Sequence, residues 1–256
     1  MFKIATWNVN SLRVRHPHVL DWLESERPDV LAIQETKVTD DAFPVEEFTD
    51  IGYQAMYSGQ KTYNGVATIS LTTADIITTE FPDYTDPQKR ILGTLINDIY
   101  MLNLYVPNGS EINSEKYKYK LDWLSHLQNY TNDILKIFKH CILLGDFNIA
   151  PADEDVHDPE EWAGKILCSD NEREALSSLT NVGLKDCYRI FNQEKNMFSW
   201  WDYRAAGFRR NRGLRIDLIL ASLSLSDHCQ KCNIDIAPRK LERPSDHTPV
   251  VAEFNI

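Results

Sequence analysis

Apolar and polar residues alternate along several short stretches of the chain, a pattern typical of β-strands. Phe2–Val9 shows this alternation, and Cys141–Leu144 is a continuous apolar run that suits a strand covered on both faces. Arg90–Ile96 and Tyr100–Val106 predict a hairpin that turns at Asn97-Asp98. The same reasoning predicts further strands at Val30–Ile33, Asn64–Leu71, Ile76–Phe81, Phe198–Tyr203, Ile216–Ala221 and Pro249–Phe254.

Other stretches repeat apolar residues every three or four positions, which predicts amphipathic helices. Ser114–Phe138 is the longest of them, and its apolar stripe indicates core packing. Val19–Glu26 predicts a second helix, which Pro28 stops. Ser169–Glu172 has the residue pattern of a capping box, which predicts a helix that ends near Gly183.

The predicted strands and helices are interleaved along the chain, yet hairpins are frequent, so both parallel and antiparallel strand pairs are expected. We therefore predict an α/β fold in which two mixed β-sheets pack face to face with helices outside. No linker, low-complexity segment or short repeat divides the sequence. A single domain over residues 1–256 is expected.

The composition is that of an ordinary globular protein, with 43% hydrophobic and 25% charged residues. No apolar run is as long as a membrane span, and the first residues show no signal-peptide pattern, so we expect a cytoplasmic protein without membrane contact. Five scattered cysteines favour a reducing compartment over a disulfide framework. Cys229 and Cys232 have metal or redox spacing, but no second pair lies nearby, so chance spacing is favoured.

Charge is distributed unevenly along the chain, whose formal net charge is −11. Between Lys185 and Arg243, twelve lysines and arginines face seven aspartates and glutamates, a local charge of +5, so the remainder carries −16. An acidic body with one basic segment is compatible with local contact to a phosphate backbone and with cations held elsewhere. Five arginines of this segment share one predicted loop with two glycines: Arg204, Arg209, Arg210, Arg212 and Arg215 with Gly207 and Gly213.

Polar side chains occur repeatedly where a predicted strand begins or ends. Asp146 and Asn148 follow Gly145, which we take as the end of its strand, and in an extended chain their side chains point the same way. Tyr105 and Asn108 flank the rigid Pro107 at another strand exit. The set of such residues that we expect to form a site is Asn8, Glu35, Tyr105, Asp146, Asn148, Asp217, Asp246 and His247.

These residue types together suit one kind of chemistry. Carboxylates such as Glu35 and the amide oxygen of Asn8 are hard donors, and few of them have basic neighbours in sequence, which favours a cation such as Mg²⁺ or Mn²⁺. Asp217 could fix the tautomer of His247, while Tyr105 and Asn148 could donate to a developing oxyanion. The set therefore indicates metal-assisted hydrolysis of a phosphoester by water.

Seven motifs in order make the chain resemble a known family. They are Trp-Asn-Val-Asn at 7–10, Gln-Glu-Thr-Lys at 34–37, Tyr-Val-Pro-Asn-Gly at 105–109, Gly-Asp-Phe-Asn at 145–148, Phe-Ser-Trp-Trp-Asp-Tyr-Arg at 198–204, Arg-Gly-Leu-Arg-Ile-Asp at 212–217 and Pro-Ser-Asp-His at 244–247. Together they resemble the exonuclease III family of abasic-site endonucleases, within the endonuclease/exonuclease/phosphatase superfamily. The resemblance covers essentially the whole chain.

This resemblance implies a four-layer α/β sandwich and Mg²⁺-dependent incision of double-stranded DNA 5′ to abasic sites, with Mn²⁺ as a substitute. In the family, 3′→5′ exonuclease and 3′-end-cleaning activities usually accompany incision, so blocked 3′ ends are a further expected substrate. Position by position, the resemblance assigns Glu35 with Asn8 and Asp246 to the metal site, and Asp217 with His247 to a carboxylate–imidazole pair.

The remaining assignments surround the scissile phosphate and the sugar. Tyr105, Asp146 and Asn148 match the groups around the phosphate, and Asp146 and Asn148 are expected close to the metal. The resemblance leaves open whether Asp146 or His247 activates the water, and whether one metal ion or two take part. Leu214 stands where the eukaryotic-type branch carries tryptophan, so the wall of the sugar pocket is aliphatic on that side, as in the bacterial type. The residues expected to bind substrate are Asn108, Trp200, Leu214, Ile216, Arg209, Arg210 and Arg212.

Two other functions fit parts of the pattern. A superfamily phosphatase or phosphodiesterase acting on lipid or inositol phosphates would use the same metal and histidine, but the aromatic stretch and the arginines that follow it favour DNA. A non-catalytic DNA-binding module is disfavoured, because every matched catalytic position is filled. No repeated apolar stripe suggests assembly, so we expect a monomer.

Overall fold

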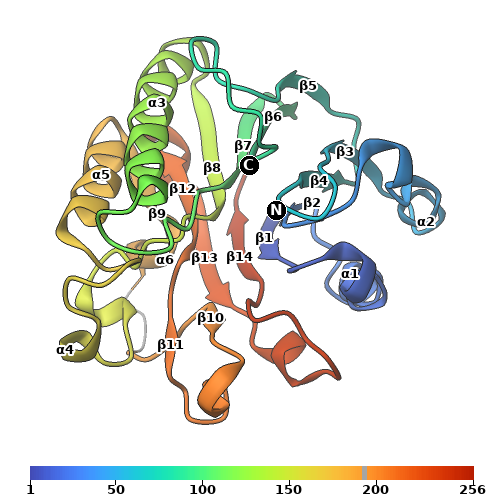
Figure 1. Ribbon diagram of the computed structural model, residues 1–256. Coiled ribbons are helices and arrows are strands. Elements are labelled where there is room, and N and C mark those ends of the chain that lie inside the picture. Colours follow the sequence, from blue (N-terminus) through green and yellow to red (C-terminus); the bar gives the residue numbers. More distant parts are fainter. Residues whose placement is uncertain (192–194) are drawn as a thin grey trace.

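Two six-stranded β-sheets packed face to face form the centre of the computed structural model, which describes residues 1–191 and 195–256 (Figure 1). The first sheet has the order β13-β14-β1-β2-β4-β3, in which β1 and β2 are parallel and the other pairs are antiparallel. Its strands are β1 (Phe2–Asn8), β2 (Val30–Gln34), β3 (Gln54–Ser58), β4 (Val66–Ser70), β13 (Cys229–Ile234) and β14 (Val250–Phe254).

The second sheet has the order β5-β6-β7-β8-β12-β9, with one parallel pair, β7 and β8. Its strands are β5 (Asp75–Thr78), β6 (Ile91–Ile96), β7 (Ile99–Tyr105), β8 (His140–Asp146), β9 (Leu184–Asp186) and β12 (Asp217–Ser222). A small ribbon of β10 (Trp200–Trp201) and β11 (Gly213–Leu214) extends from one end of the sandwich (Figure 1). Both sheets are therefore mixed, as the frequent hairpins predict.

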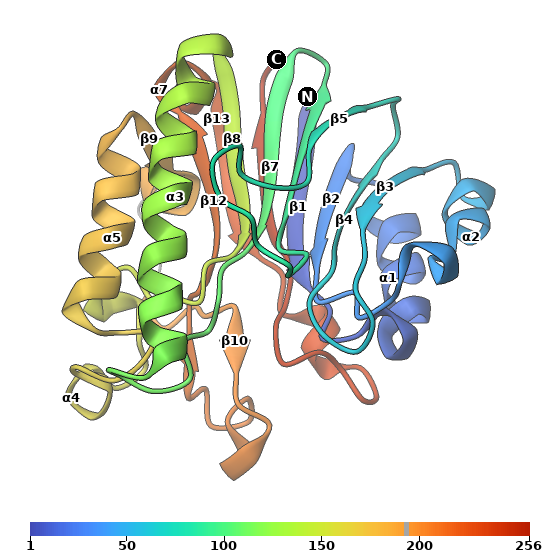
Figure 2. The same ribbon diagram turned by 45° about the horizontal axis from the view of Figure 1, so that its top comes forward.

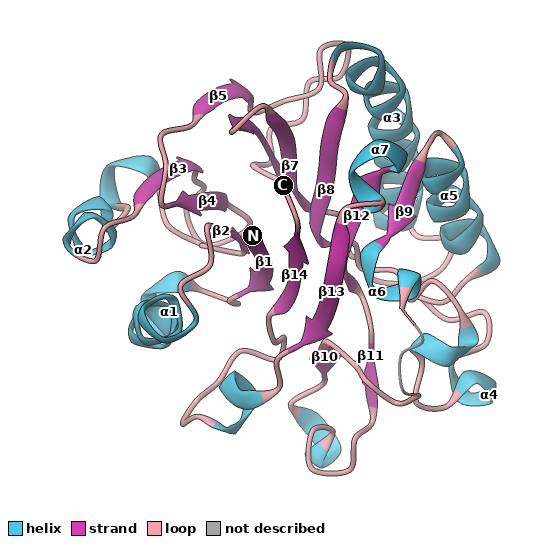
Figure 3. Cartoon of the chain, turned by 180° about the vertical axis from the view of Figure 1, so that it is seen from behind, coloured by secondary structure: helices cyan, strands magenta, loops and turns pink. Residues whose placement is uncertain are grey.

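Helices cover the outer face of each sheet and complete the four layers (Figures 2 and 3). The helices of the described residues are α1 (Leu12–Glu26), α2 (Val45–Asp50), α3 (Glu115–Ile137), α4 (Pro159–Trp162), α5 (Asp170–Asn181), α6 (Cys187–Ile190) and α7 (Leu223–Ser226). α1 and α2 pack on the first sheet, while α3 and α5 lie side by side on the second. The short helices α6 and α7 instead contribute Tyr188 and Leu225 to the core between the two sheets. The predicted α/β sandwich is confirmed.

Each interface between layers has its own apolar core. Residues such as Ile4, Ala32 and Ile142 fill the space between the two sheets. The apolar stripe of α3, represented by Leu124 and Leu127, packs against β7, β8 and β12. The central strands β2, β4, β8 and β12 are buried on both faces, which explains why their sequences are largely apolar and not alternating.

The first helix begins earlier than the sequence predicts. α1 starts at Leu12, not at Val19, and continues through Pro17. The backbone N–H of Leu12 donates to the carbonyl of Thr36 at 3.0 Å. This contact with the segment after β2 stabilises the first turn of α1. Because it is a contact between distant parts of the chain, the local spacing of apolar residues did not predict where the helix begins.

Several predicted strand limits are also wrong. β8 continues through Gly145 to Asp146, so the glycine does not end the strand. It allows β8 to lie close to β7, since a Cβ at this position would lie 1.9 Å from the carbonyl oxygen of Leu104. β10 is much shorter than the predicted strand Phe198–Tyr203, and β5 ends at Thr78. The strands β3, β9 and β13 were not predicted, since their short sequences mix polar and apolar residues.

The capping box at the start of α5 is confirmed, with the Ser169 hydroxyl and Glu172 carboxylate each accepting the expected backbone hydrogen bond. All five cysteines are buried and free of disulfides. A bulge in β13 lets both Cys229 and Cys232 face the interior. Among the helices of the described residues, none has the length and apolar character needed to cross a membrane.

Candidate active site

Strand pairing brings the predicted site residues to one end of the sandwich. Asn8 ends β1, and its parallel partner Gln34 ends β2 directly before Glu35. In the second sheet Tyr105 pairs with Asp146, and Asp146 pairs with Asp217 across the antiparallel neighbour β12. The polar positions that follow separate apolar strands in sequence therefore share one edge in space.

The Asn8 side chain joins the two sheets at this edge. Its amide nitrogen donates to Glu35 Oε1 at 2.9 Å and to Asp146 Oδ2 at 2.8 Å. Its amide oxygen accepts the backbone N–H of Asn10 at 2.9 Å. The sequence predicts that this oxygen faces a metal, whereas in the structure the nitrogen faces the two carboxylates and the oxygen shapes the turn after β1.

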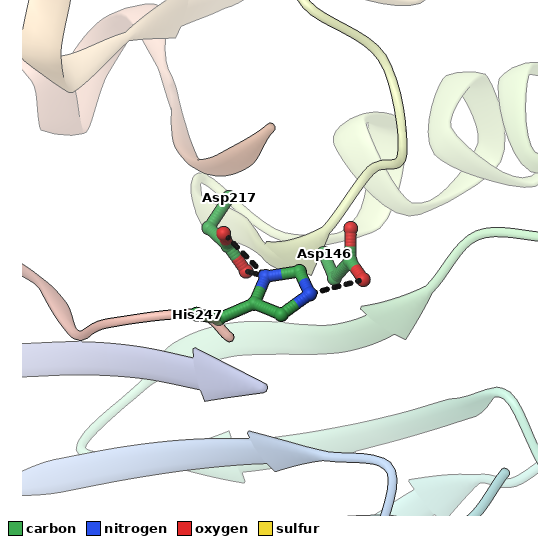
Figure 4. A group of neighbouring side chains, drawn as sticks. All are labelled: Asp146, Asp217 and His247. Carbon is green, nitrogen blue, oxygen red and sulfur yellow. Dashed lines mark hydrogen bonds and ion pairs between the residues drawn. The ribbon is translucent and has the colours of Figure 1, made fainter. Parts of the chain in front are cut away.

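His247 lies between two buried carboxylates (Figure 4). Its Nδ1 donates to Asp217 Oδ2 at 2.9 Å, and its Nε2 lies 3.7 Å from Asp146 Oδ2. The Ser199 hydroxyl accepts the backbone N–H of Asp217 at 3.0 Å, and the indole of Trp7 donates to the backbone carbonyl of His247 at 3.3 Å. These hydrogen bonds hold the backbone of both members of the carboxylate–imidazole pair in place.

The electrostatics of this cluster reflect its burial. Burial is the main cause that raises the pKa of Asp146 to about 7, with further contributions from the charges of Asp217 and Glu35. Burial alone would lower the pKa of His247, but the carboxylates of Asp217 and Asp146 outweigh it and raise that pKa to about 10. The imidazole is therefore held in its charged form by the two carboxylates.

Asp246 precedes His247 and faces a different set of partners. Its Oδ1 accepts the side-chain amide of Asn10 at 2.9 Å, and its Oδ2 accepts the indole N–H of Trp200 at 3.0 Å. Burial opposes its ionisation, but the charge of His247 and these two hydrogen bonds hold the pKa of Asp246 below its usual value. Asp246 is thus an ionised carboxylate beside the cluster.

Tyr105, Asn108 and Asn148 border the cluster on the side of the second sheet. The Asn108 amide donates to Asn148 Oδ1 at 2.9 Å, and the Asn148 amide donates to Asp146 Oδ2 at 3.1 Å. Asn148 has a φ of 51°, so the extended chain predicted between Asp146 and Asn148 is wrong. Their side chains meet instead because the backbone N–H of Asn148 bonds to Asp146 Oδ1 at 2.9 Å. Burial, then Glu35 and Asp146, raise the pKa of Tyr105 well above 10, so its hydroxyl stays protonated.

Two polar residues of the site were not assigned a role from sequence. Lys37 forms an ion pair with Glu35 Oε2 at 2.9 Å and donates to Asn10 Oδ1 at 2.6 Å. Glu35 is therefore one of the few oxygen donors of the set with a basic neighbour in sequence, and the two are in contact. Both Asn10 and Lys37 lie inside motifs quoted above, so their motif membership was the available signal.

The predicted sugar pocket is packed more tightly than expected. Trp200, Leu214 and Ile216 do lie in one cluster, together with Leu167 and partly buried Trp162. Leu214 is 0% exposed and Ile216 is 1% exposed, so neither presents an open surface. Of the three predicted residues, Trp200 alone is partly accessible.

The arginines of the predicted basic loop have different environments in the structure. Arg209 and Arg210 are exposed at its tip. Arg212 is tied to Glu161 Oε2 at 2.6 Å. Arg215, predicted to belong to the same loop, is 1% exposed and ion-paired with Asp155 and Asp186, at 2.6 and 2.7 Å. Its assignment to a basic loop is wrong, because Arg215 pairs inside the fold with acidic residues that are distant in sequence.

Comparison with known proteins places this site in a family. Residues 5–247 match the sequence pattern of the Endonuclease/Exonuclease/phosphatase family. The chain belongs to this family. Exodeoxyribonuclease III of Haemophilus influenzae is 38% identical, and the alignment covers 98% of this chain and 99% of that protein. The predicted resemblance to the exonuclease III family is thereby confirmed.

Two solved structures have the same fold as this chain along their whole length. A 3′ phosphatase from Neisseria bound to a product DNA hairpin is 42% identical, and an AP endonuclease from Archaeoglobus fulgidus is 38% identical. Each superposes with a TM-score of 0.95 and with 100% of both chains covered. Nucleases of this family are metal-dependent, and in this member Asp146, Asp217 and His247 each have an atom able to bind a metal within 4.8 Å of the others.

Proposed function

We propose that this family member is a Mg²⁺-dependent DNA repair nuclease that hydrolyses the phosphodiester 5′ to abasic sites in duplex DNA. We further propose that it removes nucleotides and blocking groups from 3′ ends, that Mn²⁺ substitutes for Mg²⁺, and that it acts in the cytoplasm as a monomer of one domain. The observation that carries the proposal is the amide of Asn8, which joins Glu35 and Asp146 from opposite sheets beside the Asp217–His247 pair.

The donor set fits a hard divalent cation. Asp146 is a buried carboxylate with Asp217 and Glu35 as acidic neighbours, and such a group is costly to ionise unless positive charge compensates it. We expect Glu35 and Asp146 to provide oxygen ligands, with Asn8, Asp246 and Asn148 around them. A bound Mg²⁺ would polarise the scissile phosphate and lower the pKa of water.

The remaining residues have separate tasks in this proposal. Asp217 orients the imidazole of His247, whose Nε2 points toward Asp146 (Figure 4). From this position Nε2 would contact an oxygen of a phosphate bound beside Asp146. The amides of Asn108 and Asn148 and the protonated hydroxyl of Tyr105 would be neutral donors for the charge that develops on the phosphate. One N–H of Asn148 donates to the carbonyl of Val106 at 3.0 Å, so Asn148 would exchange its other hydrogen bond, to Asp146 Oδ2, for one to the phosphate. Trp200, backed by Leu214 and Ile216, would contact the deoxyribose.

One cleavage assay tests the proposal. Duplex DNA with a single abasic site, and a second duplex with a 3′-phosphate, are incubated with the protein in Mg²⁺, in Mn²⁺ or in EDTA, and a phosphoinositide is offered in parallel. We expect cleavage of both duplexes with either metal and none in EDTA. Hydrolysis of the phosphoinositide without DNA cleavage would instead indicate the lipid phosphatase function, whereas the relatives described above carry the names of DNA-directed enzymes.

The exposed arginines give a prediction about DNA binding. The double variant Arg209→Ala/Arg210→Ala should bind duplex DNA more weakly, and the slope of log affinity against log salt should fall by about 0.9 for each DNA phosphate that the variant no longer neutralises. Single-turnover cleavage at saturating DNA should change much less, because these side chains lie outside the carboxylate cluster. The measurement is a fluorescence-anisotropy titration at several salt concentrations.

A matched control removes two positive charges elsewhere. Lys136 and Lys139 are exposed near the start of β8, whereas Asp146 ends that strand at the site. Lys136→Ala/Lys139→Ala should leave the salt slope nearly unchanged. Equal slopes for wild type and the arginine variant would exclude Arg209 and Arg210 from the DNA interface.

A further inference from the structure

A buried lysine lies directly behind the site and takes no part in the function proposed so far. Lys120 belongs to α3, whose sequence pattern indicated only core packing, and it is 0% exposed. Its ammonium donates to Glu172 Oε1 at 2.5 Å, to the backbone carbonyl of Asn148 at 2.7 Å and to that of Asn108 at 3.2 Å. Three N–H donors thus meet three acceptors, so the ammonium has no donor left for another partner.

The two carbonyls belong to the residues whose side chains border the carboxylate cluster. The amide of Asn108 contacts Asn148, and the amide of Asn148 contacts Asp146. Asn108 follows β7 and Asn148 follows β8, so one ammonium holds the backbone of both loops at the point where their side chains turn toward the site. Gly109 packs on the stem of the same lysine, where an added Cβ would lie 3.1 Å from Lys120 Cδ.

Glu172 fixes the position of that ammonium. Its Oε2 accepts the backbone N–H and the hydroxyl of Ser169, at 3.1 and 2.7 Å, within the capping box of α5. Its Oε1 also accepts the backbone N–H of Leu167 at 3.1 Å. The pair therefore connects α3, the start of α5 and both loops. Figure 2 shows α3 and α5 side by side on the second sheet.

Stability alone does not explain a buried ion pair at this point. Burying two charges carries a desolvation cost, and apolar side chains of similar volume often stabilise a fold equally well. An apolar side chain, however, offers no donor to the two carbonyls, whereas an ammonium offers three with fixed directions.

We propose that Lys120, held by Glu172, is a positioning residue for phosphodiester hydrolysis: it sets the backbone of Asn108 and Asn148 so that their amides face the scissile phosphate. This inference rests on the proposed nuclease function. Lys120 touches no substrate, so its effect on the reaction passes through the two asparagines. Small displacements of groups that contact the reacting atoms can cost about 100-fold in rate.

The first test is the variant Lys120→Met, which keeps the length of the side chain and removes the donors. Steady-state cleavage of the abasic duplex should show kcat lowered by about 10- to 100-fold with KM changed less than about threefold. Hydrogen exchange should become faster at the amides of Ser110, Asn148 and Ala150 in the two loops. Leu127→Ala, which opens the core under the same helix seven residues beyond Lys120, should lower thermal stability but leave kcat near the wild-type value.

Two further variants separate positioning from folding. Lys120→Met/Glu172→Leu removes both charges, so it should regain thermal stability relative to Lys120→Met while kcat stays low. In an Asn148→Ala background, Lys120→Met should lower kcat much less than it does in wild type, because the two residues act in series.

The possible results are distinct. A wild-type kcat in folded Lys120→Met, recovery of kcat together with stability in the double variant, or an undiminished effect in the Asn148→Ala background would each overturn the positioning role. If wild type itself cleaves no DNA, the nuclease proposal fails, and hydrogen exchange then decides the structural claim: unchanged exchange in the loops overturns it as well.

Discussion

Replacing Glu35 by alanine should lower DNA cleavage by about 1000-fold, with partial recovery at high Mg²⁺. In the proposed site Glu35 is a charged ligand that comes from the first sheet, and its loss removes several kcal/mol of transition-state stabilisation by the metal, which corresponds to about three orders of magnitude in rate. Recovery at high Mg²⁺ follows because Asp146 still provides an oxygen ligand. Single-turnover incision of an abasic duplex across a range of Mg²⁺ concentrations measures both effects.

The control for this experiment is Glu115→Ala, which removes an 88%-exposed side chain in the first turn of α3. It should cleave like wild type at every Mg²⁺ concentration. Glu35→Ala lacks the ion pair with Lys37, so thermal denaturation is used to check that the variant is folded. Wild-type cleavage by Glu35→Ala in the presence of EDTA would eliminate the metal site as proposed.

The second large effect is expected at the carboxylate–imidazole pair. His247→Ala should lower turnover by about 100- to 10,000-fold, the range typical of a positioned acid or base, and Asp217→Asn should also impair turnover, because His247 would lack the carboxylate that orients it. Since Asp217 acts through His247, the double variant should be little worse than His247→Ala alone.

The measurement is kcat for the two single variants and the double variant on the same DNA substrate. Ser224→Ala provides a control at a half-buried hydroxyl just after β12, at the end of that strand opposite Asp217. Reductions in kcat that multiply in the double variant would show that Asp217 and His247 act independently, and the pairing in the mechanism would then have to be abandoned.

Structural features that depend on residues close together in the sequence were predicted well. Apolar runs such as Cys141–Leu144 are short-range signals, and the fold buries them as their composition predicts, with both faces covered. The capping box at Ser169 is equally local and was predicted for the same reason. The polar residues that follow these runs were identified as site candidates because polar groups at strand ends are exceptions to the apolar pattern.

Sequence could not predict which distant residue satisfies each polar group. Asn8 contacts Asp146 across 138 positions, and Arg215 is buried by Asp155 across 60. Arg215 and Arg209 look alike in sequence, yet one is an internal ion pair and the other is exposed. The difference depends on which acidic side chains the fold brings near, and no local pattern encodes that.

The sequence by itself determined the α/β class, the family motifs and the polar residues that belong to the site, because these depend on residue type and short-range order. The tertiary structure decided which ends of the strands meet, that the Asn8 nitrogen faces the carboxylates, and that Lys120 lies behind both asparagine loops. The physical reason is that strand pairing and buried hydrogen bonds are long-range interactions: each buried donor must find an acceptor, and its partner is fixed only when the layers pack.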